Sequence, residues 1–113
     1  MLRVVLSDGD KGLVLVGGKQ KGAWYCCAQL TEEDRSAVVN DQGCGDALVA
    51  GFASAFAEAS RSGENEATPR EIVRRMVASA TANLFTSIPG ELSIQHLQRF
   101  GQHSMLTLVD LNE

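Results

Sequence analysis

A glycine-rich turn followed by an aspartate is the part of this sequence best suited to chemistry. Gly43, Cys44, Gly45 and Asp46 follow an apolar pair and precede a run of small and apolar residues that predicts a helix. The first turn of a helix has backbone N–H groups without intrahelical partners and a partial positive charge. Glycine lets such a backbone approach a bound anion closely. Because Asp46 stands beside the turn and can accept a hydroxyl proton, the pattern indicates phosphoryl transfer, which depends mostly on positioning and charge stabilisation.

The elements that must position this turn are predicted from the rest of the chain. Residues 2–6 and 13–16 are rich in leucine and β-branched residues, and the turn residues between them indicate a β-hairpin. A third strand is expected over 23–28, and Val38-Val39 leads into the glycine turn as the end of another strand. The helix after the turn should run from Cys44 to about Ser60.

The second half of the chain reads as helical. Thr68, Pro69 and Glu71 form a capping-box start, which predicts a helix from 69 to about 84. One stripe of that helix, at spacings of three and four, contains Ile72, Met76, Ala80 and Asn83. Ser93 is expected to cap a short helix that ends near Phe100, and a final strand is expected over 106–109. The polar stretch 30–37 is expected to be a connection or a single helical turn.

Residues 40–52 resemble the second signature of the PfkB/ribokinase family of carbohydrate kinases. The matching positions are Asn40, Gly43, Gly45, Asp46, Ala47, Val49, Ala50, Gly51 and Phe52. The resemblance implies that Asp46 is the base acting on a sugar hydroxyl and that the amides of Gly43, Cys44 and Gly45 form an anion hole. The chain departs from the family pattern at Gln42, Cys44 and Leu48, although a cysteine at 44 keeps its backbone N–H.

The resemblance continues on both sides of the signature. Ser7, Gly9 and Gly12 match a Ser-x-Gly-x-x-Gly hairpin that helps to form the family's nucleotide pocket, and Asn83 matches an asparagine near the purine. The implied fold class is α/β, with residues 1–113 as a single domain that forms the C-terminal part of a ribokinase-like three-layer α/β sandwich. Its sheet should contain 2–6, 13–16 and 38–39 and should carry the two long helices. The family's N-terminal, sugar-binding half has no counterpart in this sequence.

The function that the resemblance implies is ATP-dependent transfer to a hydroxyl of a sugar or sugar phosphate. The cofactors would be ATP and Mg²⁺, with the metal held between the phosphates and no metal site on the chain itself. Because half of the family fold is missing, a homo-oligomer or a partner chain is expected to cover the exposed apolar surface. The competing hypothesis is a non-catalytic fragment that binds nucleotide weakly or serves as an interaction module.

Plainer readings of the same residues remain open. A Gly-x-Gly-Asp sequence also suits a tight strand-to-helix turn whose acid is stabilised by the helix dipole. Turns like the one from Ser7 to Gly12 are common, and Asn83 suits a helix end. His96 and His103 are read as surface histidines. Glu32, Glu33 and Asp34 are read as a solvated acidic face, and one of Cys26 and Cys27 should be buried because neighbours in a strand face opposite ways.

Composition excludes several classes of protein. The 113 residues carry a net charge of −4, whereas a nucleic-acid-binding protein shows a basic patch or stripe. No run of 18 apolar residues is present, so no membrane span is expected. The three cysteines form neither a disulfide framework nor a spaced zinc site, and they predict a protein of the reducing cytoplasm.

Overall fold

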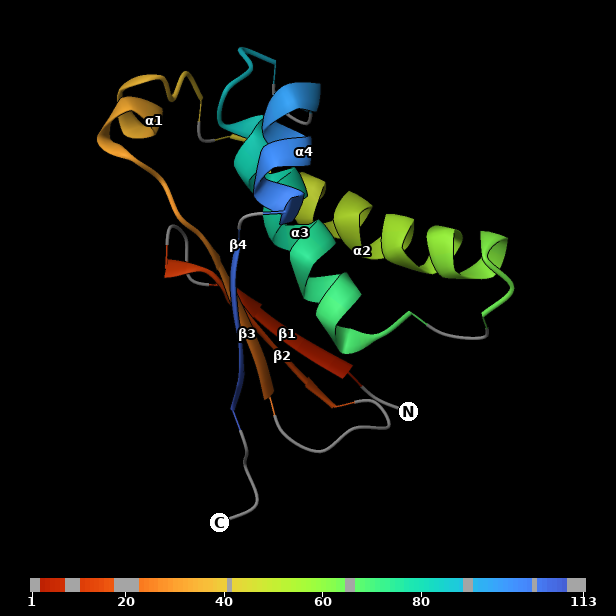
Figure 1. Ribbon diagram of the computed structural model, residues 1–113. Helices are drawn as coiled ribbons and strands as arrows, with labels where there is room; N and C mark the ends of the chain where they lie inside the picture. Colours follow the sequence, from red (N-terminus) through yellow and green to blue (C-terminus); the bar gives the residue numbers. More distant parts are fainter. Residues whose placement is uncertain are drawn as a thin grey trace.

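The computed structural model describes residues 3–7, 11–17, 23–40, 42–64, 67–88, 91–102 and 104–109. They form an α/β fold in which one four-stranded sheet is covered by helices on one face (Figure 1). The strands are β1 (Arg3–Ser7), β2 (Leu13–Gly17), β3 (Ala23–Ala28) and β4 (Ser104–Val109). The helices are α1 (Glu32–Ser36), α2 (Cys44–Arg61), α3 (Pro69–Asn83) and α4 (Ile94–Gln102).

The sheet is antiparallel throughout, in the order β1-β2-β3-β4. The predicted hairpin is confirmed, with Val5 opposite Leu15 and Ser7 opposite Leu13. Alternation along β2 turns Leu13 and Leu15 into the core, where both side chains are almost fully buried. The strands expected over 23–28 and 106–109 are confirmed as β3 and β4.

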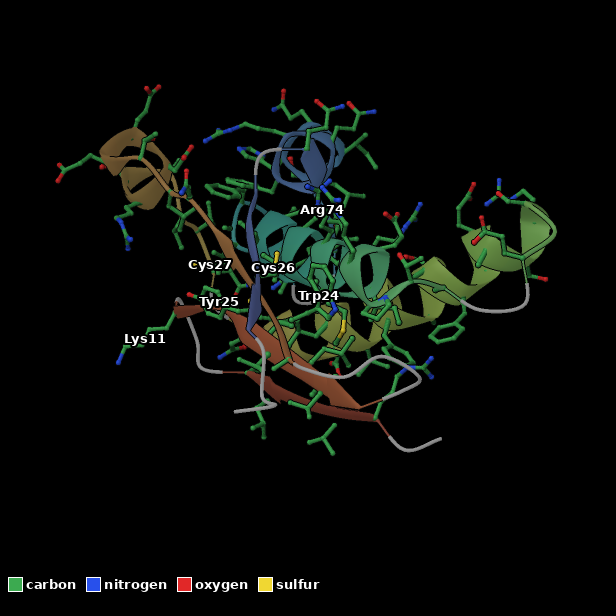
Figure 2. The ribbon with its side chains drawn as sticks, turned by 60° about the horizontal axis from the view of Figure 1, so that its bottom comes forward. Lys11, Trp24, Tyr25, Cys26, Cys27 and Arg74 are labelled. Carbon is green, nitrogen blue, oxygen red and sulfur yellow. The ribbon has the colours of Figure 1, made fainter. Side chains whose placement is uncertain are left out.

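The adjacent cysteines of β3 divide between the two faces of the sheet, as predicted. Cys26 is completely buried in the core cluster, whereas Cys27 is half-buried (Figure 2). Figure 2 also shows Tyr25 and Lys11 together at the end of the hairpin, where the Tyr25 hydroxyl donates a hydrogen bond to the Lys11 carbonyl. That contact ties the β1–β2 connection to β3.

Helix α3 lies against β2 and β3, and α2 packs on α3. Thr68 caps α3 by accepting a hydrogen bond from the Glu71 N–H, as its sequence predicts. The Glu71 carboxylate does not complete a capping box but pairs with Arg75 one turn later. A Cβ added to Gly51 would lie 2.6 Å from the Arg75 carbonyl oxygen, so glycine permits the close approach of α2 to α3.

An ion pair between Asp34 and Arg99 joins α1 to α4 and corrects the predicted solvated acidic face at Asp34, whereas Glu32 and Glu33 are exposed as predicted. Asp34 is 6% exposed, and both of its carboxylate oxygens accept hydrogen bonds from Arg99, the Nη1–Oδ1 distance being 2.8 Å. Asp34 also completes a capping box with Thr31. The hydrogen bonds from Arg99 hold the pKa of Asp34 far below its ordinary value.

Two further predictions are wrong. Val38 and Val39 belong to no strand, because the N–H groups of Val39 and Asn40 donate to the Leu84 carbonyl at the end of α3 instead of to the sheet. His96 is half-buried and stacks on Phe85 with ring centroids 3.9 Å apart, whereas His103 lies outside the described residues.

The third layer of the predicted sandwich has no counterpart among the described residues. Their long helices cover one face of the sheet, and on β1 the alternate residues Val4 and Leu6 are 44% and 63% exposed. The described part of the chain therefore forms two layers, with an apolar sheet face left open.

Candidate functional site

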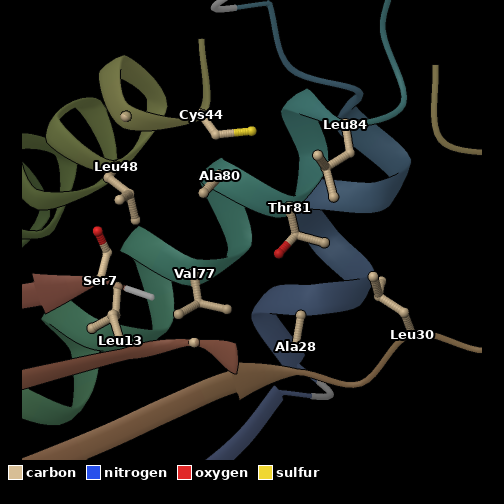
Figure 3. A pocket seen from close by; sticks show the side chains of 12 residues that line it. Ser7, Leu13, Ala28, Leu30, Cys44, Leu48, Val77, Ala80, Thr81 and Leu84 are labelled. Carbon is tan, nitrogen blue, oxygen red and sulfur yellow. The ribbon is translucent and has the colours of Figure 1, made fainter. Parts of the chain in front are cut away.

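A cavity of about 510 Å³ lies where the β1–β2 hairpin, the start of α2 and the face of α3 meet (Figure 3). Four of the residues singled out in the sequence line it, namely Ser7, Gly12, Cys44 and Gly45. They come from two separate segments of the chain, the hairpin and the start of α2, so only the fold brings them together. The remaining walls are mostly apolar and come from Leu13, Ala28, Leu30, Leu48, Val77, Ala80, Thr81 and Leu84.

The turn before α2 leaves the amides of the helix start available. Gly43 is the N-cap residue, with a left-handed φ of +85° that favours glycine, and no side chain caps the helix. The Gly43 carbonyl accepts the first helical hydrogen bond, from the Ala47 N–H at 2.9 Å. The N–H groups of Cys44 and Gly45 precede that bond and stand at the cavity, where an anion would meet them.

The side chain of Asn83 holds this turn in place. Its side chain is completely buried, and its Nδ2 donates to the Gln42 carbonyl at 2.6 Å and to the Cys44 Sγ at 3.4 Å. Asn40 supports the same carbonyl with a second hydrogen bond at 3.1 Å. A side chain with no exposed surface cannot touch a ligand, so the expected contact between Asn83 and the nucleotide is corrected to a role in holding the turn.

The hairpin side of the cavity depends on Gly12. Its φ is +103°, and a Cβ there would lie 2.4 Å from the Cys26 carbonyl oxygen. The positive φ and the close contact both require glycine, which lets the end of the hairpin lie close beside β3. Ser7 lies at the exposed end of β1, with its hydroxyl on the cavity side (Figure 3). Gly9 lies outside the described residues.

Asp46 occupies the third position of α2 and is exposed. It is not among the residues that line the cavity, although Gly45, its neighbour in sequence, is. Its carboxylate makes no hydrogen bond or ion pair within the described part of the chain. Asp46 is therefore an exposed, unbonded carboxylate that directly follows a cavity-lining residue in sequence.

Sequence reasoning missed the contribution of α3. Val77, Ala80, Thr81 and Leu84 line the cavity, and their spacing of three and four places them on one face of the helix. Of the stripe expected from the sequence, Ile72 and Met76 face the core and only Ala80 lines the cavity. A second stripe of small and apolar residues on the same helix was the available signal.

Two features are absent from the described residues, a cluster of metal ligands and a membrane-spanning helix. Within the described ranges, no group of three or more histidine, cysteine, aspartate or glutamate residues is arranged to hold a metal ion. None of the helices in those ranges is both long enough and apolar enough to cross a membrane.

The comparison with solved structures finds a likeness of fold. The chain is similar to a crystal structure from Staphylococcus aureus that is described as a "putative phosphofructokinase", with a TM-score of 0.72 and 19% identity. The likeness covers 96% of this chain and 30% of the solved one, so the chain spans under a third of that protein's length. No family model matches the sequence, and no curated protein matches it. At this identity the likeness concerns the fold alone.

Proposed function

We propose that this chain is the nucleotide-binding and base-carrying part of a carbohydrate kinase with a ribokinase-like fold of the PfkB type. The observation that supports this most directly is the convergence of Ser7, Gly12, Cys44 and Gly45 on one cavity. An apolar cavity with uncapped helix amides at one side suits a nucleotide, whose base needs apolar walls and whose phosphates need N–H donors.

In this proposal ATP is the phosphoryl donor. The base lies between the hairpin and α3, and the phosphates extend to the amides of Cys44 and Gly45 next to Gly43. Mg²⁺ enters bound to the phosphates. The backbone N–H groups stabilise negative charge that develops on the transferring group.

Asp46 is the proposed base for the acceptor hydroxyl. It is an exposed carboxylate that directly follows Gly45, and in this proposal it acts next to the phosphate end of the cavity, where the acceptor approaches. The acceptor is proposed to be a sugar or sugar phosphate. The described residues leave Asp46 exposed, so transfer requires groups supplied by further polypeptide.

The further polypeptide is proposed to be a partner chain or a second copy that covers the open sheet face. Val4 and Leu6 of β1 are 44% and 63% exposed, and β1 has one unpaired edge in the described sheet. Light scattering should find an assembly larger than the monomer, and a concentrated, well-behaved monomer would refute this part. The three cysteines are free, which fits the cytoplasm as the proposed compartment.

A nucleotide-binding module without catalysis is the second candidate. It is favoured by the exposure of Asp46 and by the small share, 30%, of the similar solved structure that the chain covers. Both candidates require ATP at the same cavity, and they differ only in transfer. A phosphotransfer assay over a panel of sugars, with and without a complementing chain, separates them.

ATP binding itself is tested by removing one amide. Proline at position 44, the first position of α2, lacks the N–H and also disfavours the ψ of −1° at Gly43, so the variant removes the amide and disturbs the turn that presents it. We expect Cys44→Pro to weaken ATP by about tenfold or more, the usual effect of losing a hydrogen bond to a charged group. Cys44→Ala keeps the N–H and should bind ATP like the unmodified chain. Calorimetric titration that detects no ATP binding by the unmodified chain at millimolar concentrations would refute the nucleotide assignment.

A further inference from the structure

A threonine hydroxyl with no hydrogen-bond partner among the described residues stands in the apolar wall of the cavity. Thr81 is 7% exposed and lies on the face of α3 that lines the cavity. Figure 3 shows its hydroxyl oxygen turned toward the interior of the ring of lining residues, with the methyl group turned away. That hydroxyl makes no hydrogen bond with any residue of the described ranges. Buried polar groups are nearly always hydrogen-bonded, so a ligand that fills the cavity and excludes water must offer this hydroxyl a partner.

The surroundings of Thr81 indicate what that partner is. Val77 and Leu84 lie about one turn away on either side, and Ala80 is next to it, so the hydroxyl is framed by apolar groups. An entirely apolar ligand would leave the hydroxyl unpaired. A fully polar ligand would lose its hydrogen bonds to water against the apolar walls, which is unfavourable. The cavity therefore suits a flat apolar body with a hydrogen-bonding edge.

We propose that Thr81 is the residue that recognises the base of the nucleotide, through a hydrogen bond between its hydroxyl and a polar edge atom of the heterocycle. This inference rests on the proposed function, since it places the base in the part of the cavity away from the Cys44 and Gly45 amides. A threonine hydroxyl both donates and accepts. Thr81 thus selects for a base that presents a polar edge, and it does not by itself distinguish adenine from guanine.

The test separates the base from the phosphates by using two probes, ATP and inorganic tripolyphosphate. Thr81→Val has nearly the same shape but no hydroxyl, and Thr81→Ser keeps the hydroxyl but lacks the methyl. We expect Thr81→Val to weaken ATP by about three- to tenfold, the value of one hydrogen bond, and to leave tripolyphosphate unchanged. Thr81→Ser should bind ATP more tightly than Thr81→Val does. Thermal unfolding checks that each variant is folded.

Each of the other possible results refutes a specific claim. If ATP binds to Thr81→Val as to the unmodified chain, or if ATP and tripolyphosphate weaken equally, Thr81 does not recognise the base, although the proposed function stands. If Thr81→Ser binds ATP no better than Thr81→Val, the hydroxyl is not the recognising group. If neither probe binds to the unmodified chain, the proposed function fails first, and the inference that rests on it fails too.

Discussion

Replacing Asn83 by leucine should loosen the glycine turn without altering any exposed residue. Leucine has nearly the same shape as asparagine, so the buried site stays filled, but the Nδ2 donor to the Gln42 carbonyl is lost. That carbonyl keeps its hydrogen bond from Asn40, so it is not left wholly unpaired. The loss of this hydrogen bond and of the weaker one to the Cys44 Sγ then lowers the free energy of unfolding by about 1–2 kcal/mol.

The cost translates into a measurable melting shift. A chain of 113 residues unfolds with an entropy that corresponds to about 4 °C per kcal/mol, so the expected fall in Tm is about 4–8 °C. ATP affinity should fall as well, because Gln42 is the residue before Gly43. Gln42→Ala is the matched control, since Asn83 binds the backbone carbonyl at that position and the Gln42 side chain is exposed. An Asn83→Leu variant that melts and binds ATP like the Gln42→Ala control would refute the role given to Asn83.

Two further predictions concern carboxylates in opposite environments. Asp46→Asn, in a complex that turns over, should keep ATP affinity and lower turnover by about 10² or more, because the amide cannot accept the hydroxyl proton; turnover equal to that of the unmodified chain would make Asp46 only a helix-start acid. Asp34 has a pKa lowered by hydrogen bonds from Arg99, so its contribution to stability is present above the unfolded pKa of about 3.9 and is lost as pH falls through the lower folded value. Chemical denaturation between about pH 5 and 2 should therefore show a steeper loss for the unmodified chain than for Asp34→Asn, and parallel profiles would contradict the ion-pair argument.

The parts of the fold that sequence predicted are those governed by local rules. The hairpin follows from two apolar runs around turn residues, and α3 begins at Thr68 because a threonine and a proline satisfy a helix start. Helix α2 begins at Cys44, directly after Gly43, because the glycine can adopt the left-handed conformation at the N-cap. Each of these signals lies within a few residues of the structure that it specifies.

The failures share a different origin, because they depend on partners distant in sequence. Asp34 reads as one of three solvated acids until Arg99, 65 residues later, is placed beside it. Val38 and Val39 have strand-forming side chains, but the Leu84 carbonyl takes the Val39 N–H. Thr81 attracts no attention in sequence, because only the packing of α3 against the hairpin and α2 turns its hydroxyl toward a cavity.

Gly51 belongs to the signature recognised in the sequence, but the physical reason for a glycine there is visible only in the structure. It matches the signature, yet its distance from the anion turn gives no reason for glycine. The structure supplies one, since any side chain at 51 would collide with the backbone of Arg75 and Met76. The glycine therefore sets the spacing of α2 and α3, the two helices that contribute Leu48 and Val77 to the cavity walls.

Three contacts shape the cavity, and all of them lie in the part that is proposed to bind the nucleotide. Gly12 brings the hairpin over β3, Gly51 brings α2 onto α3, and Asn83 holds the turn that presents the α2 amides. No comparable contact supports Asp46, which is exposed and unbonded in the described part of the chain. In the proposed function, the described residues thus supply the walls for the nucleotide and only one group, Asp46, for the acceptor. Binding and transfer should accordingly be separable in this chain, with the first a property of its own fold and the second dependent on what covers Asp46.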